Sequence, residues 1–171
     1  GTSVRFKIKR VRSNEIEDVV VTRERIHLPD IEYAGMLNDT TGYIYQSGFT
    51  ENVSGELRNA FLKLKKQGMK KLVLDLRGNG GGLMSEAVGI VSQAAGTETQ
   101  YKTTSEPIDT RIPIIVMVDS GSASSSEIVT GALQDLDRAT VMGTRTFGKG
   151  LVQSIRPLPY NGQLKVTTAK Y

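Results

Sequence analysis

Two short segments in the second half of the chain carry residues that could do chemistry together. The first is residues 121–127 (Gly-Ser-Ala-Ser-Ser-Ser-Glu), and the second is residues 146–150 (Thr-Phe-Gly-Lys-Gly), in which Lys149 lies between glycines. A serine hydroxyl becomes a nucleophile when a nearby base takes its proton, and a neutral lysine amine can be that base. Serine–lysine pairs are an established variant of the catalytic triad. The two segments therefore favour a hydrolase with an activated serine.

The composition removes most of the other nucleophilic chemistries. The chain has no cysteine, which excludes a thiol nucleophile, a disulfide framework and cysteine zinc sites. Its one histidine, His27, lies in an expected strand just before Pro29, where a core or surface role is the favoured interpretation. No Gly-x-Ser-x-Gly elbow is present. Lys149 therefore remains as the base that could serve one of the serines.

Each segment taken alone also has a simpler structural interpretation. A serine just before a helix usually caps it, and a lysine in a turn usually lies at the surface. Residues 143–150 nearly match a phosphate-binding loop, but Gly150 stands where Ser or Thr should hold magnesium. The residues that follow read as a strand, so the helix N-terminus that binds phosphate is missing. We therefore expect no nucleotide.

A run of three glycines, residues 80–82, follows a short apolar segment. Glycine permits positive φ and close backbone approach, which leaves N–H groups free to point at an anion. The loop could form an oxyanion hole or a phosphate cradle, and a tight structural turn is the alternative. The dinucleotide-binding fingerprint fails, because Leu83 occupies the position of its third glycine.

Hydrophobic periodicity predicts the elements that would position these loops. Residues 4–8 alternate apolar and charged side chains, which predicts a half-buried strand, and residues 54–67 form the clearest amphipathic helix. Further strands are expected at residues 19–21, 42–45, 71–76, 112–118, 140–142, 151–155 and 164–169, and further helices at residues 85–94 and 124–136. Strand–glycine loop–helix, then strand–serine turn–helix, predicts an α/β fold with a largely parallel sheet. Both loops would lie at carboxyl ends of strands, where such sheets gather their ligand sites.

Length and charge limit the number of domains and the kinds of partner that the chain could have. The 171 residues suit one domain, or one domain plus a fragment, and the net charge of +4 is modest. No aromatic-rich basic stripe supports nucleic-acid binding. No apolar run approaches the length that spans a membrane. The chain begins Gly-Thr-Ser without Met, so it reads as a cut piece, and a missing targeting segment says little about localisation.

Four segments in order resemble the carboxyl-terminal processing peptidases, also called tail-specific proteases. They are residues 74–83 (Leu-Asp-Leu-Arg-Gly-Asn-Gly-Gly-Gly-Leu), 121–128 (Gly-Ser-Ala-Ser-Ser-Ser-Glu-Ile), 131–135 (Gly-Ala-Leu-Gln-Asp) and 146–153 (Thr-Phe-Gly-Lys-Gly-Leu-Val-Gln). The set spans about residues 42–171. The resemblance implies a serine endopeptidase that cleaves polypeptides near their C-terminus.

The resemblance also implies a role for individual residues. Ser124 matches the family's nucleophile, and Lys149, 25 residues later, matches its general base. Gln153 matches the residue that orients the lysine. The backbone N–H groups of Gly82 and Ser125 match the oxyanion hole. Many members carry alanine at the position of Ser125, so this serine adds a rival hydroxyl.

The same resemblance implies a ClpP/crotonase-like β/α spiral core and a domain division. Residues 1–28 would be the last strands of a truncated PDZ domain, residues 29–41 a linker, and residues 42–171 the serine protease core. The chain also looks short for the family near residues 94–101. The family's sequence continues beyond Tyr171.

The expected partners follow from the implied chemistry. The substrate would be the C-terminal part of a polypeptide, with no metal, cofactor, nucleotide or nucleic acid, and a homo-oligomer stays open. A periplasmic or other extracytoplasmic location is implied, with membrane association only through segments outside this sequence. The alternative is a peptide-binding or scaffolding module without turnover, as a truncated or inactive enzyme would be.

Overall fold

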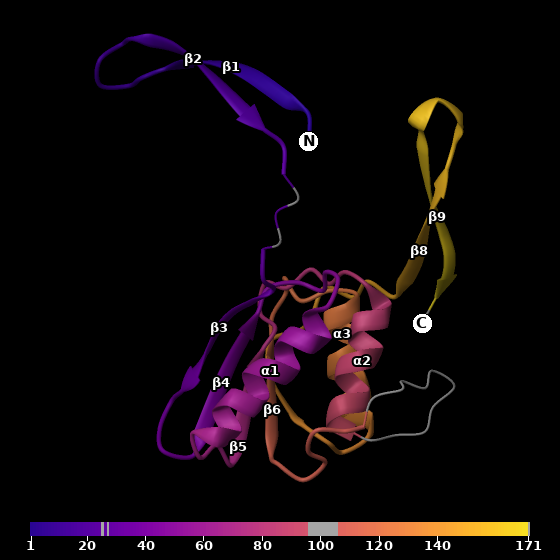
Figure 1. Ribbon diagram of the computed structural model, residues 1–171. Helices are drawn as coiled ribbons and strands as arrows, with labels where there is room; N and C mark the ends of the chain where they lie inside the picture. Colours follow the sequence, from indigo (N-terminus) through magenta and orange to yellow (C-terminus); the bar gives the residue numbers. More distant parts are fainter. Residues whose placement is uncertain (25, 27, 96–105, 171) are drawn as a thin grey trace.

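A five-stranded, mostly parallel sheet forms the centre of the molecule. In the computed structural model, which describes residues 1–24, 26, 28–95 and 106–170, its strands run in the order β3-β4-β5-β6-β7. They are β3 (Ile31–Met36), β4 (Thr41–Gln46), β5 (Lys71–Asp75), β6 (Ile114–Val118) and β7 (Thr140–Gly143). The strands from β4 to β7 pair in parallel, and β3 pairs antiparallel at the edge. The predicted α/β class with a largely parallel sheet is confirmed (Figure 1).

Three helices cover one face of this sheet: α1 (Val53–Lys66), α2 (Met84–Ala95) and α3 (Ser125–Asp135). Each presents an apolar stripe to alternate residues of the strands, because side chains of a strand point alternately to its two faces. Phe61 of α1, Ile90 of α2 and Leu133 of α3 belong to the same buried cluster. Leu72, Leu74, Ile114 and Val116 of the sheet complete it. This core holds the carboxyl ends of β5 and β6 rigidly side by side.

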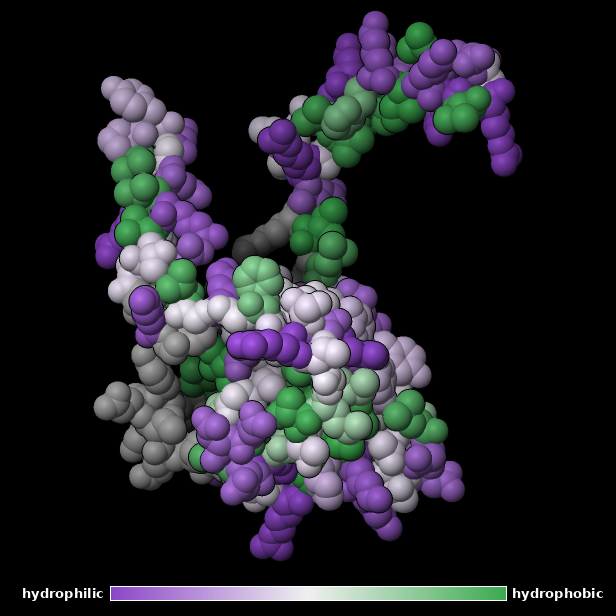
Figure 2. Space-filling model, turned by 180° about the vertical axis from the view of Figure 1, so that it is seen from behind, coloured by the Kyte–Doolittle hydropathy of each residue, from purple (hydrophilic) through white to green (hydrophobic). Residues whose placement is uncertain are grey.

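The opposite face of the sheet carries the intervening residues. Tyr43, Val73, Ile115 and Met117 lie there, and each is only half-buried. Figure 2, which views the molecule from behind, shows hydrophobic residues near the middle of the core with hydrophilic residues around them. No helix of the described residues covers this face, so the two sides of the sheet differ sharply in burial.

Two hairpins project from the same end of the core (Figure 1). The first pairs β1 (Ser3–Lys9) with β2 (Ile16–Thr22). The second pairs β8 (Leu151–Pro157) with β9 (Gln163–Lys170) around the short 3-10 turn η1 (Pro159–Asn161). The expected half-buried strand at residues 4–8 forms, but the burial prediction is wrong: Phe6 is 49% exposed, because β1 pairs only with β2 and packs on no further layer.

The segment 29–41 differs from the expected linker. It contains β3, which joins the main sheet through β4 and packs Ile31, Ala34 and Met36 against the core. Pro29 lies just before β3, and the residues of the strand do not alternate regularly between apolar and polar. The hydrophobic pattern therefore did not predict a strand here. His27 and residues 96–101 of the stretch that looked short lie outside the described residues.

The remaining predicted elements form within a few residues of their expected bounds. The amphipathic helix at residues 54–67 is α1, whose buried stripe is Val53, Leu57, Phe61 and Leu64. Gly68 follows it with φ +97, a conformation that favours glycine after a helix. Within the described residues, no helix combines the length and apolar character needed to cross a bilayer.

Candidate active site

Ser124 occupies a strained position where β6 turns into α3. Its backbone has φ 56 and ψ −114, an angle pair that side-chain-bearing residues rarely adopt. Such conformations cost about 1–3 kcal/mol and persist only where surrounding contacts enforce them. The turn is enforced by Asp119, whose carboxylate accepts hydrogen bonds from the N–H groups of Gly78 (2.8 Å) and Gly121 (2.9 Å). The serine predicted as nucleophile therefore lies on a rigid, strained corner.

The other three serines of the cluster hold the glycine loop in place. Ser122 donates its hydroxyl proton to the carbonyl of Leu76 (2.7 Å), Ser125 to that of Gly82 (3.0 Å), and Ser126 to that of Asn79 (2.8 Å). All three are buried, whereas Ser124 is only half-buried. The rival hydroxyl of Ser125 is thus engaged with a backbone carbonyl. Among the four serines, Ser124 is the least buried, and it lies at the start of α3.

Asn79 organises the glycine loop from inside. It is fully buried, and its side-chain amide donates to the carbonyl of Gln46 (2.9 Å) while its Oδ1 accepts from the N–H of Gly81 (2.9 Å). Its own carbonyl accepts from the N–H of Ala123 (3.0 Å). Asn79 therefore joins the loop after β5 to the loop after β6. Nothing in the sequence beyond its place in the glycine run identified this role.

The loop approaches the serine turn too closely for side chains. Gly81 has φ +89, and a Cβ there would lie 2.8 Å from the N–H nitrogen of Ser125 and 2.6 Å from the carbonyl oxygen of Ala123. A Cβ on Gly82 would overlap the carbonyl of Phe49. The backbone of Gly81 is therefore pressed against the start of α3, and that of Gly82 against Phe49. The first N–H groups of a helix have no partner within the helix.

Glu127, in the first turn of α3, connects the serine turn to the lysine turn. Its Oε2 accepts from the N–H groups of Ser124 (2.8 Å) and Lys149 (2.8 Å). Its Oε1 accepts from the Thr146 hydroxyl (2.8 Å) and the N–H of Gly148 (2.6 Å). Sequence reasoning missed this residue, although a Glu three positions after a serine that begins a helix is a known capping signal.

The charge of Glu127 is maintained by these contacts. Burial opposes ionisation, but the hydrogen bonds from Thr146 and from three backbone N–H groups outweigh it and lower the pKa of the carboxyl below its ordinary 4.5. A lowered pKa means that the contacts contribute stability above the ordinary value and lose it as the pH falls through the lowered one. The connection therefore persists at neutral pH and weakens in acid.

One cleft, with a volume of about 350 Å³, brings the predicted residues together. Ser124, Ser125, Gly82, Lys149 and Gln153 all line it. The remaining lining residues are Gly80, Gly81, Leu83, Met84, Ile128, Leu151, Val152 and Lys165. Gln153 reaches the cleft from β8, next to the turn that carries Lys149. Lys165, from β9, was not anticipated, because only the pairing of the hairpin brings it there.

The lining combines two lysines, Lys149 and Lys165, with apolar side chains and glycines, and no carboxylate belongs to it among the described residues. No group of three or more His, Asp or Glu side chains that could hold a metal ion occurs in the described part of the chain. The arrangement offers a hydroxyl, an amine and backbone N–H groups around a space that an extended peptide could enter.

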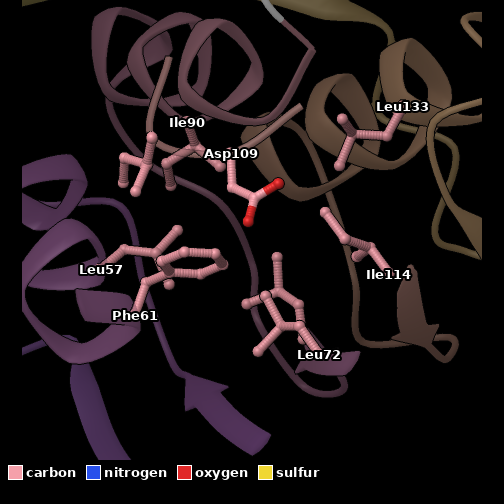
Figure 3. Close-up of a pocket in the computed structure, with 9 residues that line it drawn as sticks. Leu57, Phe61, Leu72, Ile90, Asp109, Ile114 and Leu133 are labelled. Atoms are coloured by element: carbon pink, nitrogen blue, oxygen red, sulfur yellow. The ribbon is translucent and has the colours of Figure 1, made fainter. Parts of the chain in front are cut away.

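A second pocket lies beneath the helices and has a different character. Figure 3 shows Leu57, Phe61, Leu72, Ile90, Ile114 and Leu133 around it, with the carboxylate of Asp109 among them. These are core side chains of α1, α2, α3 and the sheet, and none of the predicted site residues contributes. The predicted site residues therefore line the cleft at the carboxyl ends of β5 and β6 and not this core pocket.

Comparison with known proteins finds a matching family and similar sequences. A sequence profile of Peptidase family S41 matches residues 40–171. Proteins named "Probable CtpA-like serine protease" are similar: one from Staphylococcus aureus (strain COL) is 40% identical over 176 residues, covering 94% of this chain and 35% of the relative. One from Staphylococcus epidermidis is 35% identical over 185 residues, covering 100% of this chain and 37% of the relative.

A solved structure shares the fold over nearly the whole chain. The photosystem II D1 C-terminal processing protease is 30% identical with a TM-score of 0.70, and the match covers 98% of this chain and 49% of that one. The chain spans about a third of the length of the curated relatives described above.

Proposed function

The chain belongs to peptidase family S41, and we propose that it forms the core of a serine endopeptidase that cleaves polypeptides near their C-terminus. The observation that carries the proposal is the shared cleft: Ser124, Lys149 and the glycine loop arrive from three separate loops and line one space. The strained backbone of Ser124 supports it, since strain of this kind clusters at active sites.

In the proposed first step, the neutral amine of Lys149 takes the proton of the Ser124 hydroxyl as its oxygen attacks a peptide carbonyl. The new bond gives a tetrahedral intermediate, and Lys149 then passes the proton to the leaving amine. The acyl-enzyme that remains is hydrolysed by water, with Lys149 again as the base. Gln153, which lines the same cleft from β8, orients the lysine.

The oxyanion of the intermediate would be stabilised by the N–H groups of Gly82 and Ser125. The support for this pair is the close approach of the glycine loop to the start of α3. Preorganised donors of this kind act without reorganisation during the reaction, and removal of one typically lowers the rate by about 10²–10³-fold.

The proposed substrate is an extended polypeptide that adds as a strand beside the cleft. The hydrolysis described needs no metal, cofactor, nucleotide or nucleic acid. We assign residues 1–28 to the end of a PDZ domain and residues 42–171 to the protease core, following the family resemblance. The same resemblance supports a periplasmic or other extracytoplasmic location.

A fluorophosphonate probe tests the proposal directly. We expect the intact protein to be labelled at Ser124, and the labelling to disappear in Ser124→Ala and in Lys149→Ala. Absence of labelling in the intact protein would favour a peptide-binding scaffold without turnover.

The dependence of peptide hydrolysis on pH gives an independent test of the lysine. The rate should rise toward alkaline pH, because only a neutral amine can accept the proton. Lys149→Arg should be inactive, since arginine stays charged at any accessible pH. Retained hydrolysis in Lys149→Arg would remove Lys149 as the base.

A further inference from the structure

We propose that Glu127 is a positioning residue: its carboxylate fixes the turn that carries Ser124 relative to the turn that carries Lys149. This inference rests on the proposed function. A single oxygen, Oε2, accepts the backbone N–H groups of both Ser124 and Lys149, each at 2.8 Å. The two residues come from different loops, so this oxygen joins directly the main chains of the proposed nucleophile and base.

The serine side of this connection is rigid. Glu127 lies in the first turn of α3, which begins immediately after Ser124, and the helix packs Val129 and Leu133 into the core. The position of the carboxylate relative to Ser124 is therefore set by the helix itself. Glu127 can therefore hold the segment that carries Lys149 at a fixed position relative to Ser124.

The position of the segment that carries Lys149 depends more on Glu127. Residues 144–150 form no helix or strand. The first part of the segment is tied to the core by the N–H of Thr144, which donates to Val118, and by the N–H of Phe147, which donates to Ser122. The part nearest the base is tied by Gly148 and Lys149, whose N–H groups both donate to Glu127. Beyond it lies the β8–β9 hairpin, whose strands pair only with each other.

Proton transfer from the Ser124 hydroxyl to the Lys149 amine needs a fixed relative position of the two groups. A displacement of about 1 Å can lower the rate on the order of 10²-fold. The chemistry of the side chain fits the task. Four donors converge on two oxygens, and an ionised carboxylate is the side chain that accepts on both. Glutamine offers one acceptor oxygen, so in either orientation its NH₂ group would face two donors.

Glu127→Gln in the intact protein tests the proposal, because it keeps the size and removes the charge. We expect kcat for a peptide substrate and the rate of fluorophosphonate labelling at Ser124 to fall together by about 10- to 100-fold. KM should stay within about twofold, since Glu127 does not belong to the lining of the cleft. Thr146→Val removes one donor to Oε1 and leaves Oε2 untouched, so its kcat should fall by less than about fivefold.

Glu86 offers a matched control. Its carboxylate also accepts from two backbone N–H groups, those of Asn52 (3.2 Å) and Ser54 (2.9 Å), and from the Ser54 hydroxyl (2.6 Å). It lies in the first turn of α2, connects to α1, and does not line the cleft. Glu86→Gln should lower the melting temperature by an amount comparable to Glu127→Gln while kcat changes by less than about twofold.

The outcomes separate this proposal from the proposed function. If Ser124 of the unchanged protein is labelled and Glu127→Gln is labelled within about twofold of the same rate, Glu127 does not position the pair, and the proposed function stands. Equal losses of kcat in Glu127→Gln and Glu86→Gln would also overturn the proposal, because general destabilisation would then explain both. If the unchanged protein is not labelled at Ser124, the proposed function fails first and the positioning role fails with it.

Discussion

At the scale of single residues, the glycine loop shows how backbone proximity restricts the sequence. Gly81 lies so close to the serine turn that a methyl group would meet both the Ala123 carbonyl oxygen and the Ser125 nitrogen. Gly80, its neighbour, has no other atom within 4 Å of the place where its Cβ would lie. Two adjacent glycines in one loop therefore have very different tolerance for substitution.

Gly81→Ala should lower kcat by about 10²–10³-fold, because the added methyl displaces the N–H of Ser125 from the proposed oxyanion hole. Labelling of Ser124 and peptide hydrolysis measure this loss. Gly80→Ala is the control, and we expect it to keep its melting temperature and its labelling. Unchanged labelling in Gly81→Ala would contradict the placement of the oxyanion hole at this contact.

At the scale of elements, a single carboxyl ties α1 to the segment that leads into β6. Asp109 accepts from Lys65 of α1 (2.9 Å) and from the N–H groups of Arg111 and Ile112, just before β6. Figure 3 shows its carboxylate among the apolar side chains of the helix–sheet interface. Burial raises the pKa of Asp109, but the contacts from Lys65 and the two N–H groups outweigh it and lower the pKa from 3.8 to about 2.

Because the pKa of Asp109 is lowered on folding, its contribution to stability is present above its ordinary value of 3.8 and disappears as the pH falls toward about 2. Asp109→Asn should therefore lower the free energy of unfolding by about 1–2 kcal/mol near neutral pH. The difference in the free energy of unfolding between the variant and the unchanged protein should shrink in acid. Urea unfolding near neutral pH and at a pH close to 2 measures it. Asp18→Asn, an exposed carboxyl in β2, should show no such effect. A pH-independent difference for Asp109→Asn would count against the lowered pKa.

The β8–β9 hairpin brings a second lysine, Lys165, to the cleft. Gln153 and Lys165 lie on its two strands and both line the cleft, while Arg156 of the same hairpin does not. With the exposed Lys165 and no carboxylate in the described lining, the cleft should favour peptides with an acidic group near the bond that is cleaved.

Lys165→Met should lower kcat/KM for such acidic peptides by about 3- to 10-fold and leave neutral peptides unchanged. The effect should diminish at high salt, because the lysine is exposed. Arg156→Met removes the same charge from the same hairpin outside the cleft, and we expect it to have no effect on this preference. An equal effect on acidic and neutral peptides would exclude a charge-based role for Lys165.

At the scale of the whole molecule, the N-terminal hairpin and the core are joined by little secondary structure. The strands β1 and β2 pair only with each other, and one face of the hairpin exposes Phe6, Ile8 and Val21. A two-stranded hairpin is marginally stable by itself, so this apolar face suits a larger unit. That is the support for assigning residues 1–28 to a separate domain.

Removal of residues 1–28 should leave the core folded. We expect the melting temperature of the remaining chain to change by less than about 3 °C, because β3 and the apolar cluster stay intact. Calorimetry of the two forms measures the difference. Loss of the cooperative transition in the shortened chain would show that the hairpin belongs to the core, and the proposed boundary would be wrong.

The sequence by itself was enough to predict most of the helices and strands in order, with β3 missed, and to suggest the chemistry of two loops. Helices and strands with a buried face repeat apolar residues at fixed periods, and α1 and β5 carry that signal plainly. The absence of cysteine and the single histidine left Lys149 as the base, and the family resemblance singled out Ser124.

Only the tertiary structure decided which groups meet. It shows that three of the four clustered serines donate their hydroxyls to backbone carbonyls in and beside the glycine loop. It also shows that Glu127 joins two loops and that residues 31–36 are an edge strand. These facts depend on hydrogen bonds between segments far apart in the chain. Such contacts produce no repeating pattern in the sequence, because a donor and its acceptor come together only when the chain has folded.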